Sequence, residues 1–128
     1  PLINPFTKSQ PDNQYVEMNG QEVFKFATRK IPSILEELSQ NSGIPLQKVN
    51  CFLLHQANER IIQTAAKRLK LDETLFPINL HRYGNTSAAS IAILLDECIR
   101  NNTIKKGNII VLAGFGGGLT WGGILMEI

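Results

Sequence analysis

Three kinds of feature are scarce in this sequence, and each scarcity argues against a class of protein. The 128 residues include two cysteines, Cys51 and Cys98, which do not form the closely spaced pairs of a zinc site, so no metal is expected. They also make no disulfide framework. Free buried thiols and a reducing, cytoplasmic location are therefore favoured.

Long apolar runs and clusters of basic residues are also missing. The apolar stretches fall far short of the ~18 residues that a transmembrane helix needs, so no membrane span is expected. The formal net charge is +2 and no dense Lys/Arg tract occurs, which argues against nucleic-acid binding. An apolar share of 43% with 19% charged residues is typical of one soluble globular domain.

The beginning of the chain differs in composition from the rest. Residues 1–13 hold three prolines and few periodic apolar positions, so residues 1–14 are interpreted as an extended lead-in. Residues 15–128 are expected to form one domain.

Three segments space their apolar residues by three or four, which places them on one face of a helix. The first runs from Gly20 to about Gln40 and ends at Gly43, and Pro32 predicts a kink or a break inside it. The second begins after Asn58, which is expected to cap it. The third covers residues 87–99, and its expected apolar stripe is Ala88, Ile91, Ala92, Leu95 and Ile99.

Short apolar runs between these helices predict strands. The candidates are residues 49–54, 76–80, 109–113 and 119–128, and a glycine turn joins the last two as a hairpin. Strands that alternate with helices predict a mixed, mainly parallel sheet with helices on both faces and an antiparallel C-terminal hairpin. The fold class is therefore α/β.

Polar and glycine residues follow the predicted strands. His55 follows the first strand, Asn85 follows the second and opens the third helix, and the glycine run GFGGG (residues 114–118) follows the next strand. Ligands in open α/β sheets bind beyond the carboxyl ends of the strands. The three segments are therefore expected to converge at one edge of the sheet.

The residue types at this edge suit the stabilisation of negative charge. A neutral imidazole and a carboxamide NH₂ both donate hydrogen bonds, so the two groups aimed at one oxygen would stabilise an enolate. Glycines let backbone N–H groups approach a substrate closely. Each feature also has a structural explanation: His55 as a structural hydrogen-bonder, Asn85 as a helix cap, and the glycines as a hairpin turn.

Four segments of the chain resemble a known enzyme as a set. They are EMNGQEVFKFA (17–27), LLHQANERII (53–62), RYGNTSAASI (82–91) and GFGGGLTWGGILM (114–126). Together they look like the C-terminal half of β-ketoacyl-acyl-carrier-protein synthase III, over about residues 15–128. Related plant-type polyketide synthases carry a proline in the glycine loop and thiolases a cysteine, whereas residues 116–118 here are all glycine.

The resemblance implies a fold and an activity. The fold would be thiolase-like, with two similar α/β halves. The activity would be the decarboxylative Claisen condensation of acyl-CoA with malonyl-acyl carrier protein in fatty acid biosynthesis, without a cofactor.

The resemblance also implies roles for particular residues. His55 and Asn85 would be catalytic and would stabilise the enolate that decarboxylation releases, while the N–H of Gly117 would serve a second oxyanion hole. The substrate pocket would include Phe115, Met18, Gly20 and Asn58. The docking surface for acyl carrier protein would include Lys25, Arg60, Lys67 and Arg68.

The nucleophilic cysteine of such enzymes belongs to the N-terminal half, and neither Cys51 nor Cys98 matches its motif. The 128 residues alone are therefore expected to be inactive, with the N-terminal half as their partner in a full-length protein that is a homodimer. Two other readings stay open. The chain could be a non-catalytic partner or carrier-protein docking subunit, or part of a synthase III-like enzyme of secondary metabolism.

Overall fold

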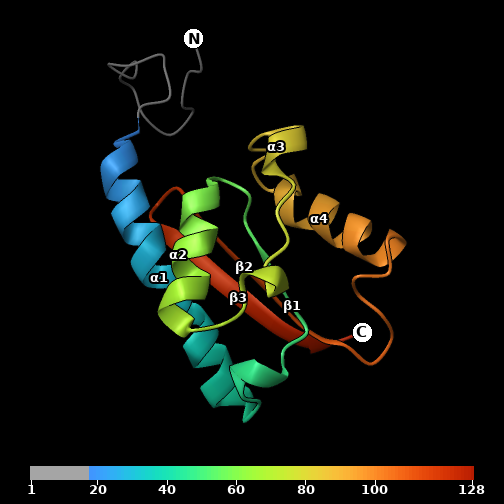
Figure 1. Cartoon of the computed structure of the whole chain (residues 1–128). Helices are drawn as coiled ribbons and strands as arrows, with labels where there is room; N and C mark the ends of the chain where they lie inside the picture. The colour runs from blue at the N-terminus through green and yellow to red at the C-terminus, as the bar shows by residue number, and fades with distance from the viewer. Residues whose placement is uncertain (1–17) are drawn as a thin grey trace, which may run out of the picture.

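The fold is a small mixed sheet between helices. The computed structural model describes residues 18–128, so the predicted lead-in lies outside the described residues. The helices are α1 (Gly20–Ser42), α2 (Glu59–Leu69), α3 (Leu80–Tyr83) and α4 (Ala89–Arg100), and the strands are β1 (Cys51–Leu54), β2 (Ile109–Gly116) and β3 (Thr120–Glu127) (Figure 1). Two 3₁₀ turns, η1 (Leu46–Lys48) and η2 (Glu73–Leu75), complete the described elements.

The sheet has the order β1-β2-β3. β1 and β2 are parallel, with Leu54 opposite Ala113, and β2 and β3 form the expected antiparallel hairpin. Because β1 and β2 end side by side, the residues that follow them are neighbours in space. No helix within residues 18–128 is long and apolar enough to cross a bilayer.

Helices cover both faces of the sheet, as predicted. Successive side chains of a strand point to opposite faces. Phe52 and Leu54 therefore pack with α1 and α2, whereas Cys51 and Leu53 pack toward α4. In Figure 1, α1 and α2 lie together on one side of the strands and α4 lies on the other.

Helix α1 runs without interruption through Pro32, so the predicted break was wrong. Asn19 caps its start by accepting the N–H of Glu22 at 3.2 Å, and Gly43, with φ of 69°, ends it as expected. Proline lacks the N–H that would bond to the carbonyl four residues earlier, on Thr28. Nη1 of Arg68 donates to that carbonyl at 3.0 Å instead, so the carbonyl keeps a partner.

The predicted strand at residues 76–80 was also wrong. The segment packs beside β1, with the ring of Phe76 stacked on that of Phe52 at 4.6 Å. Pro77 has no N–H for a ladder, and the N–H of Asn79 donates to the side chain of Gln56 at 3.1 Å. The segment therefore leads into α3 as irregular backbone.

Helix α4 buries a face that only partly overlaps the predicted stripe, since Ile91 and Leu95 pack partly buried against the core. Ser90, Leu94 and Cys98 are its buried residues, at successive intervals of four. Most of the predicted stripe is exposed or partly exposed, including Ala88, Ala92 and Ile99. The prediction followed hydropathy and ignored Ser90 and Cys98, although small side chains allow a helix to pack closely on a sheet.

Candidate active site

A cavity of about 390 Å³ lies where β1 and β2 end and α4 begins. It brings together the three segments that the sequence predicted to converge. Its lining includes His55, Asn85, Phe115 and Gly117, together with Ser87, Ala88, Ser90, Ile91, Gly114 and Gly116.

Backbone and ring contacts fix His55 directly after the C-terminal end of β1. Its N–H donates to the carbonyl of Ala113 at 2.9 Å, which continues the pairing of β1 with β2. The ring of Phe115 meets the imidazole edge-on, with 5.3 Å between ring centroids. A Cβ at Gly114 would lie 3.4 Å from Cδ1 of Ile91 and 3.7 Å from Cβ of His55, at ordinary van der Waals distance, so the backbone of β2 runs beside both side chains.

The imidazole is neutral in this environment. Burial lowers the pKa of His55 below its ordinary value of 6.5, because leaving water disfavours the charged ring. Among the residues that line the cavity, His55 is the only titratable one, so none of them supplies a carboxylate to stabilise an imidazolium. The ring can therefore act as a hydrogen-bond donor near pH 7.

Asn85 presents one end of its carboxamide. Its Oδ1 accepts the N–H of Ser87 at 2.9 Å, which leaves the NH₂ group as the end available to a ligand. The loop is tightly turned, with φ of 68° at Gly84 and 51° at Ser87. Two expectations were wrong here: Asn85 follows α3 rather than a strand, and α4 begins four residues later, at Ala89.

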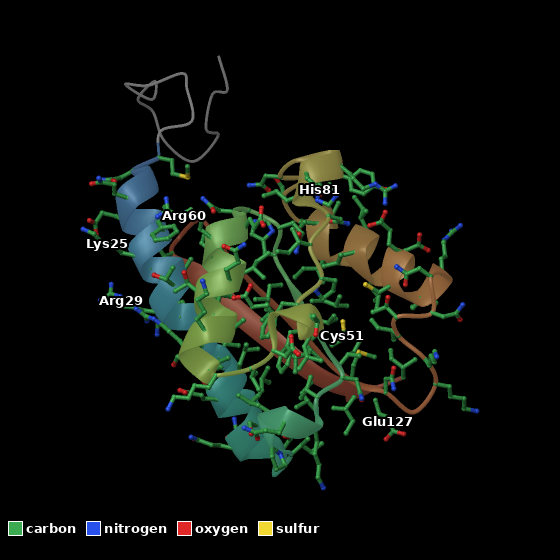
Figure 2. The ribbon with its side chains drawn as sticks, in the orientation of Figure 1. Lys25, Arg29, Cys51, Arg60, His81 and Glu127 are labelled. Atoms are coloured by element: carbon green, nitrogen blue, oxygen red, sulfur yellow. The ribbon has the colours of Figure 1, made fainter. Side chains whose placement is uncertain are left out.

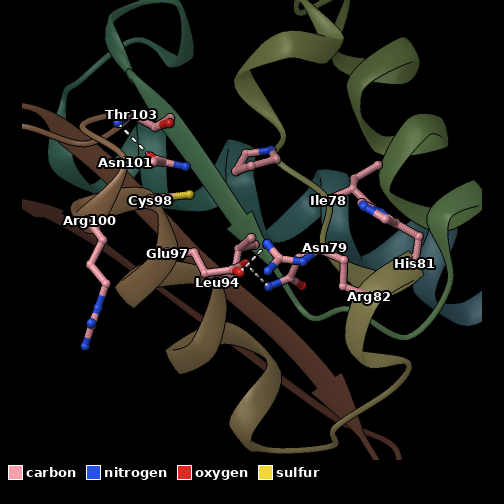
Figure 3. A pocket seen from close by; sticks show the side chains of 11 residues that line it. Ile78, Asn79, His81, Arg82, Leu94, Glu97, Cys98, Arg100, Asn101 and Thr103 are labelled. Carbon is pink, nitrogen blue, oxygen red and sulfur yellow. Dashed lines mark hydrogen bonds and ion pairs between the residues drawn. The ribbon is translucent and has the colours of Figure 1, made fainter.

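A hydrogen-bond network holds the segment before Asn85 against α4. Glu97 accepts hydrogen bonds from Nδ2 of Asn79, from Nη1 of Arg82 and from the hydroxyl of Tyr83, each at 2.7 Å. These bonds lower the pKa of Glu97. Figure 3 shows Glu97 joined to Asn79 and Arg82 in the lining of a second pocket.

Three of the predicted pocket residues do not line the cavity. Met18 is 71% exposed, and it lies with Gly20 at the start of α1. Asn58 is exposed and caps α2, as predicted, by accepting the N–H of Arg60 at 2.9 Å. Phe115 is the one member of that set that lines the cavity with His55.

The predicted docking residues lie on α1 and α2, which pack side by side. Figure 2 shows Lys25 and Arg60 near the starts of these helices and Arg29 about one turn further along α1. The guanidinium of Arg60 lies over the ring of Phe24, 5.3 Å from its centroid. Arg29 was not predicted, although it lies four residues after Lys25 and therefore on the same helical face.

The remaining docking candidates make contacts of their own. Lys67 lies 3.8 Å from Glu73, and both side chains are exposed. Arg68 donates to the carbonyl of Thr28, so part of its role is structural.

Both cysteines are buried, and neither thiol is readily ionised to the thiolate that acts as a nucleophile. Burial and the neighbouring Cys98 raise the pKa of Cys51 to about 12, and burial also raises that of Cys98. Within residues 18–128, no group of three or more His, Cys, Asp and Glu side chains is placed to hold a metal ion.

The sequence reasoning missed two buried polar residues beside His55. Oγ of Ser90 lies 2.6 Å from Nδ1 of His55, and Nε2 of Gln56 donates to the carbonyl of Leu54 at 2.8 Å. Both are nearly inaccessible to solvent. Their positions inside the segments HQAN and NTSAAS were the available signal, because a polar residue among small or apolar neighbours is often there for its hydrogen bond.

The fold and its cavity define a class, the thiolase-like α/β domain. The crystal structure of 3-oxoacyl-[acyl-carrier-protein] synthase III from Aquifex aeolicus VF5 matches with a TM-score of 0.87 and 39% identity, over 89% of this chain and 37% of that one. The parallel β1-β2 pair with antiparallel β3 agrees with the predicted fold class.

The family is shown by sequence as well. The family model "3-Oxoacyl-[acyl-carrier-protein (ACP)] synthase III C terminal" matches residues 38–128, and the chain belongs to this family. It is 45% identical over 126 residues to the β-ketoacyl-[acyl-carrier-protein] synthase III of Prochlorococcus marinus subsp. pastoris, and 44% over 130 residues to that of Streptococcus mutans. These matches cover 98% and 99% of the chain but 38% and 40% of the relatives' length, which confirms the resemblance to a C-terminal part.

Proposed function

We propose that this chain provides the decarboxylation site of a 3-oxoacyl-acyl-carrier-protein synthase III. The observation that carries the proposal is the cavity in which a neutral imidazole, a carboxamide and a glycine loop meet without another titratable group. Such a site stabilises a developing oxyanion through fixed donors. The family membership and the lengths of the relatives support the same conclusion.

The proposed reaction begins with the malonyl thioester. Nε2–H of His55 and the NH₂ of Asn85 donate to the thioester carbonyl oxygen. The bond between the α-carbon and the carboxylate breaks, CO₂ leaves, and the electron pair moves into an enolate whose oxygen both donors stabilise. The α-carbon then attacks the acyl thioester on a cysteine of the N-terminal half and the thiolate leaves, which gives the 3-oxoacyl product. This scheme uses no cofactor.

The other site residues take supporting roles in the proposal. The N–H of Gly117 stabilises the oxyanion of the acyl-transfer step, and Phe115 shapes the malonyl pocket beside His55. Met18, Gly20 and Asn58 lie outside the cavity, at the starts of α1 and α2. Their proposed role is to contact the pantetheine arm of the substrate.

The docking surface in this proposal consists of the basic patch and two further residues. The basic patch is defined as Lys25, Arg29 and Arg60, and the further residues are Lys67 and Arg68 in the last turn of α2. Acyl carrier protein is acidic, so the patch acts on encounter rate and register, and its effect weakens as salt rises. The patch covers the N-terminal half of α1 and the start of α2 (Figure 2).

The complete protein is proposed to include an N-terminal half, to be a homodimer and to act in the cytoplasm. Exposed apolar side chains on α4 and β3 support a covering partner, because Ile99 is 47% and Ile124 57% exposed. A non-catalytic docking subunit is the second candidate, favoured by the buried, high-pKa thiols of Cys51 and Cys98.

Malonyl decarboxylation by the complete protein tests the proposal. Asn85→Ala and His55→Ala should each lower the rate roughly 10²–10³-fold, the loss typical of one oxyanion donor. Asn41→Ala, at an exposed position near the end of α1, is the matched control and should leave the rate unchanged. A decarboxylation rate that Asn85→Ala does not alter contradicts the enolate role, and a complete protein without condensing activity favours the docking subunit.

A further inference from the structure

Ser90 makes two hydrogen-bond contacts through a single oxygen. Its side chain, from the first turn of α4, is 2% exposed. Oγ lies 2.6 Å from Nδ1 of His55 and accepts the N–H of Gln56 at 3.3 Å. An amide N–H can only donate, so the hydroxyl proton of Ser90 remains available for the imidazole.

We propose that Ser90 is a positioning residue that donates to Nδ1 of His55 and so keeps the ring proton on Nε2. In the opposite tautomer, Nδ1–H would donate to Oγ and the hydroxyl proton would need another acceptor. Among residues 18–128 this hydroxyl makes no hydrogen bond to another acceptor, and a buried hydroxyl proton without a partner costs free energy. The geometry therefore selects the Nε2–H tautomer.

The choice of serine also fits the charge state of the ring. A carboxylate at this position would stabilise the imidazolium, whereas a hydroxyl does not. The groups that face His55 are Ser90 and Ile91 of α4, Phe115 and Gly114 of β2, and the loop of Asn85, and none of them is titratable. Ser90 thus fixes which nitrogen donates without charging the ring.

The consequence for the reaction rests on the proposed function. With the proton held on Nε2, His55 meets the thioester oxygen as a ready donor. Without Ser90, both tautomers are populated, and only one of them can donate to the oxyanion. The expected loss is in the rate of decarboxylation, with the KM for malonyl-acyl carrier protein unchanged.

The test uses the complete protein labelled with ¹⁵N-histidine. Long-range ¹H–¹⁵N spectra at pH 7.5 should show Nε2 protonated and Nδ1 as an acceptor in the unmodified protein. Ser90→Ala should give a mixture of tautomers and a decarboxylation rate about five- to tenfold lower, the equivalent of one hydrogen bond. Ser39→Ala removes another helix hydroxyl, one that donates to Ile44 at 2.7 Å, and should change neither.

Two results overturn the proposal: a proton on Nδ1 in the unmodified protein, or an unchanged tautomer in Ser90→Ala. The first measurement needs no variant, so it decides the question even where Ser90→Ala does not fold. Failure of the proposed function is separate. It appears as unchanged decarboxylation in His55→Ala, while the spectra still report on Ser90.

Discussion

Nη1 of Arg68 donates to the main-chain carbonyl of Thr28 at 3.0 Å, and this is the carbonyl that Pro32 deprives of its helical donor. We expect Arg68→Ala to lower the free energy of unfolding by about 1 kcal/mol, because the carbonyl loses its hydrogen bond to protein. In a Pro32→Ala background the backbone N–H returns, and Arg68→Ala should then cost close to nothing. Urea unfolding of the four proteins in this cycle measures the coupling. Equal costs in both backgrounds would mean that Arg68 does not compensate for the proline.

Gly123 of β3 is in close contact with α1. A Cβ at this position would lie 2.7 Å from Cγ2 of Ile34 and 2.9 Å from Cδ1 of Leu38, so Gly123→Ala should destabilise the protein by about 1–3 kcal/mol through overpacking. Gly122→Ala is the matched control, because its Cβ meets nothing within 4 Å. Thermal unfolding should separate the two neighbours, and equal melting temperatures would contradict the packing of α1 on β3.

We expect the pKa of His55 to set the acid limb of decarboxylation. Burial lowers this pKa below 6.5, so the neutral donor persists into mildly acidic solution and the rate falls only as the pH drops through the lowered value. The free energy of unfolding changes with pH in the same direction. The folded state binds the proton of His55 less readily than the unfolded state does, so the stabilisation from the neutral ring is fully present above pH 6.5 and is lost as the pH falls through the lowered pKa. Rates between pH 5 and 8 test this, and a limb above pH 6.5 would contradict it.

The basic patch should act on the carrier protein and not on the chemistry. Arg60→Glu is expected to raise the KM for malonyl-acyl carrier protein about tenfold with kcat unchanged, and added salt should shrink the difference. Lys106→Glu makes the same change of charge in the exposed turn before β2, at the opposite edge of the sheet from the cavity, and should have little effect. Equal effects from the two reversals would point to net charge and not to a docking surface.

Glu97 should influence the Asn85 loop without touching substrate. Glu97→Ala removes the acceptor shared by Asn79, Arg82 and Tyr83, so amide hydrogen exchange in residues 79–85 should quicken and decarboxylation should fall several-fold. Because the pKa of Glu97 is lowered, its contribution to stability is present above the ordinary value of 4.5 and is lost as the pH falls.

The neighbouring Asp96 provides the control for Glu97. It pairs with Arg100 on the exposed side of the same helix, at 2.8 Å. Asp96→Ala should change neither hydrogen exchange in residues 79–85 nor the decarboxylation rate. Slow exchange in both variants would mean that the network does not hold the loop.

The parts that sequence predicted well depend on local patterns. Periodicity located α1 and α2, Asn58 caps α2 as predicted, and alternation with helices predicted the parallel pair and the hairpin. The rule that parallel strands end at one edge of a sheet brought His55 and Gly117 together, whereas Asn85 lines the same cavity although it follows α3 and not a strand. Their catalytic roles stay predictions.

The errors arose where a side-chain contact between segments distant in the sequence decided the local structure. Arg68 supplies the donor that Pro32 lacks, so the helix does not break. The side chain of Gln56 accepts the N–H of Asn79, so residues 76–80 form no strand hydrogen bonds with β1. Ser90 faces His55, so α4 buries a face that hydropathy marked only in part. Each depends on a contact between residues more than twenty positions apart, which no local window of sequence contains.

The burial of Cys51 and Cys98 has a practical consequence for chemical probing. Both thiols are buried and their pKa values are raised, so alkylating reagents applied to the native protein at neutral pH should leave them unmodified. A covalent adduct formed under those conditions then reports on a cysteine elsewhere in the complete protein. The cysteines of this region should therefore contribute no signal when the complete protein is labelled with electrophilic acyl analogues.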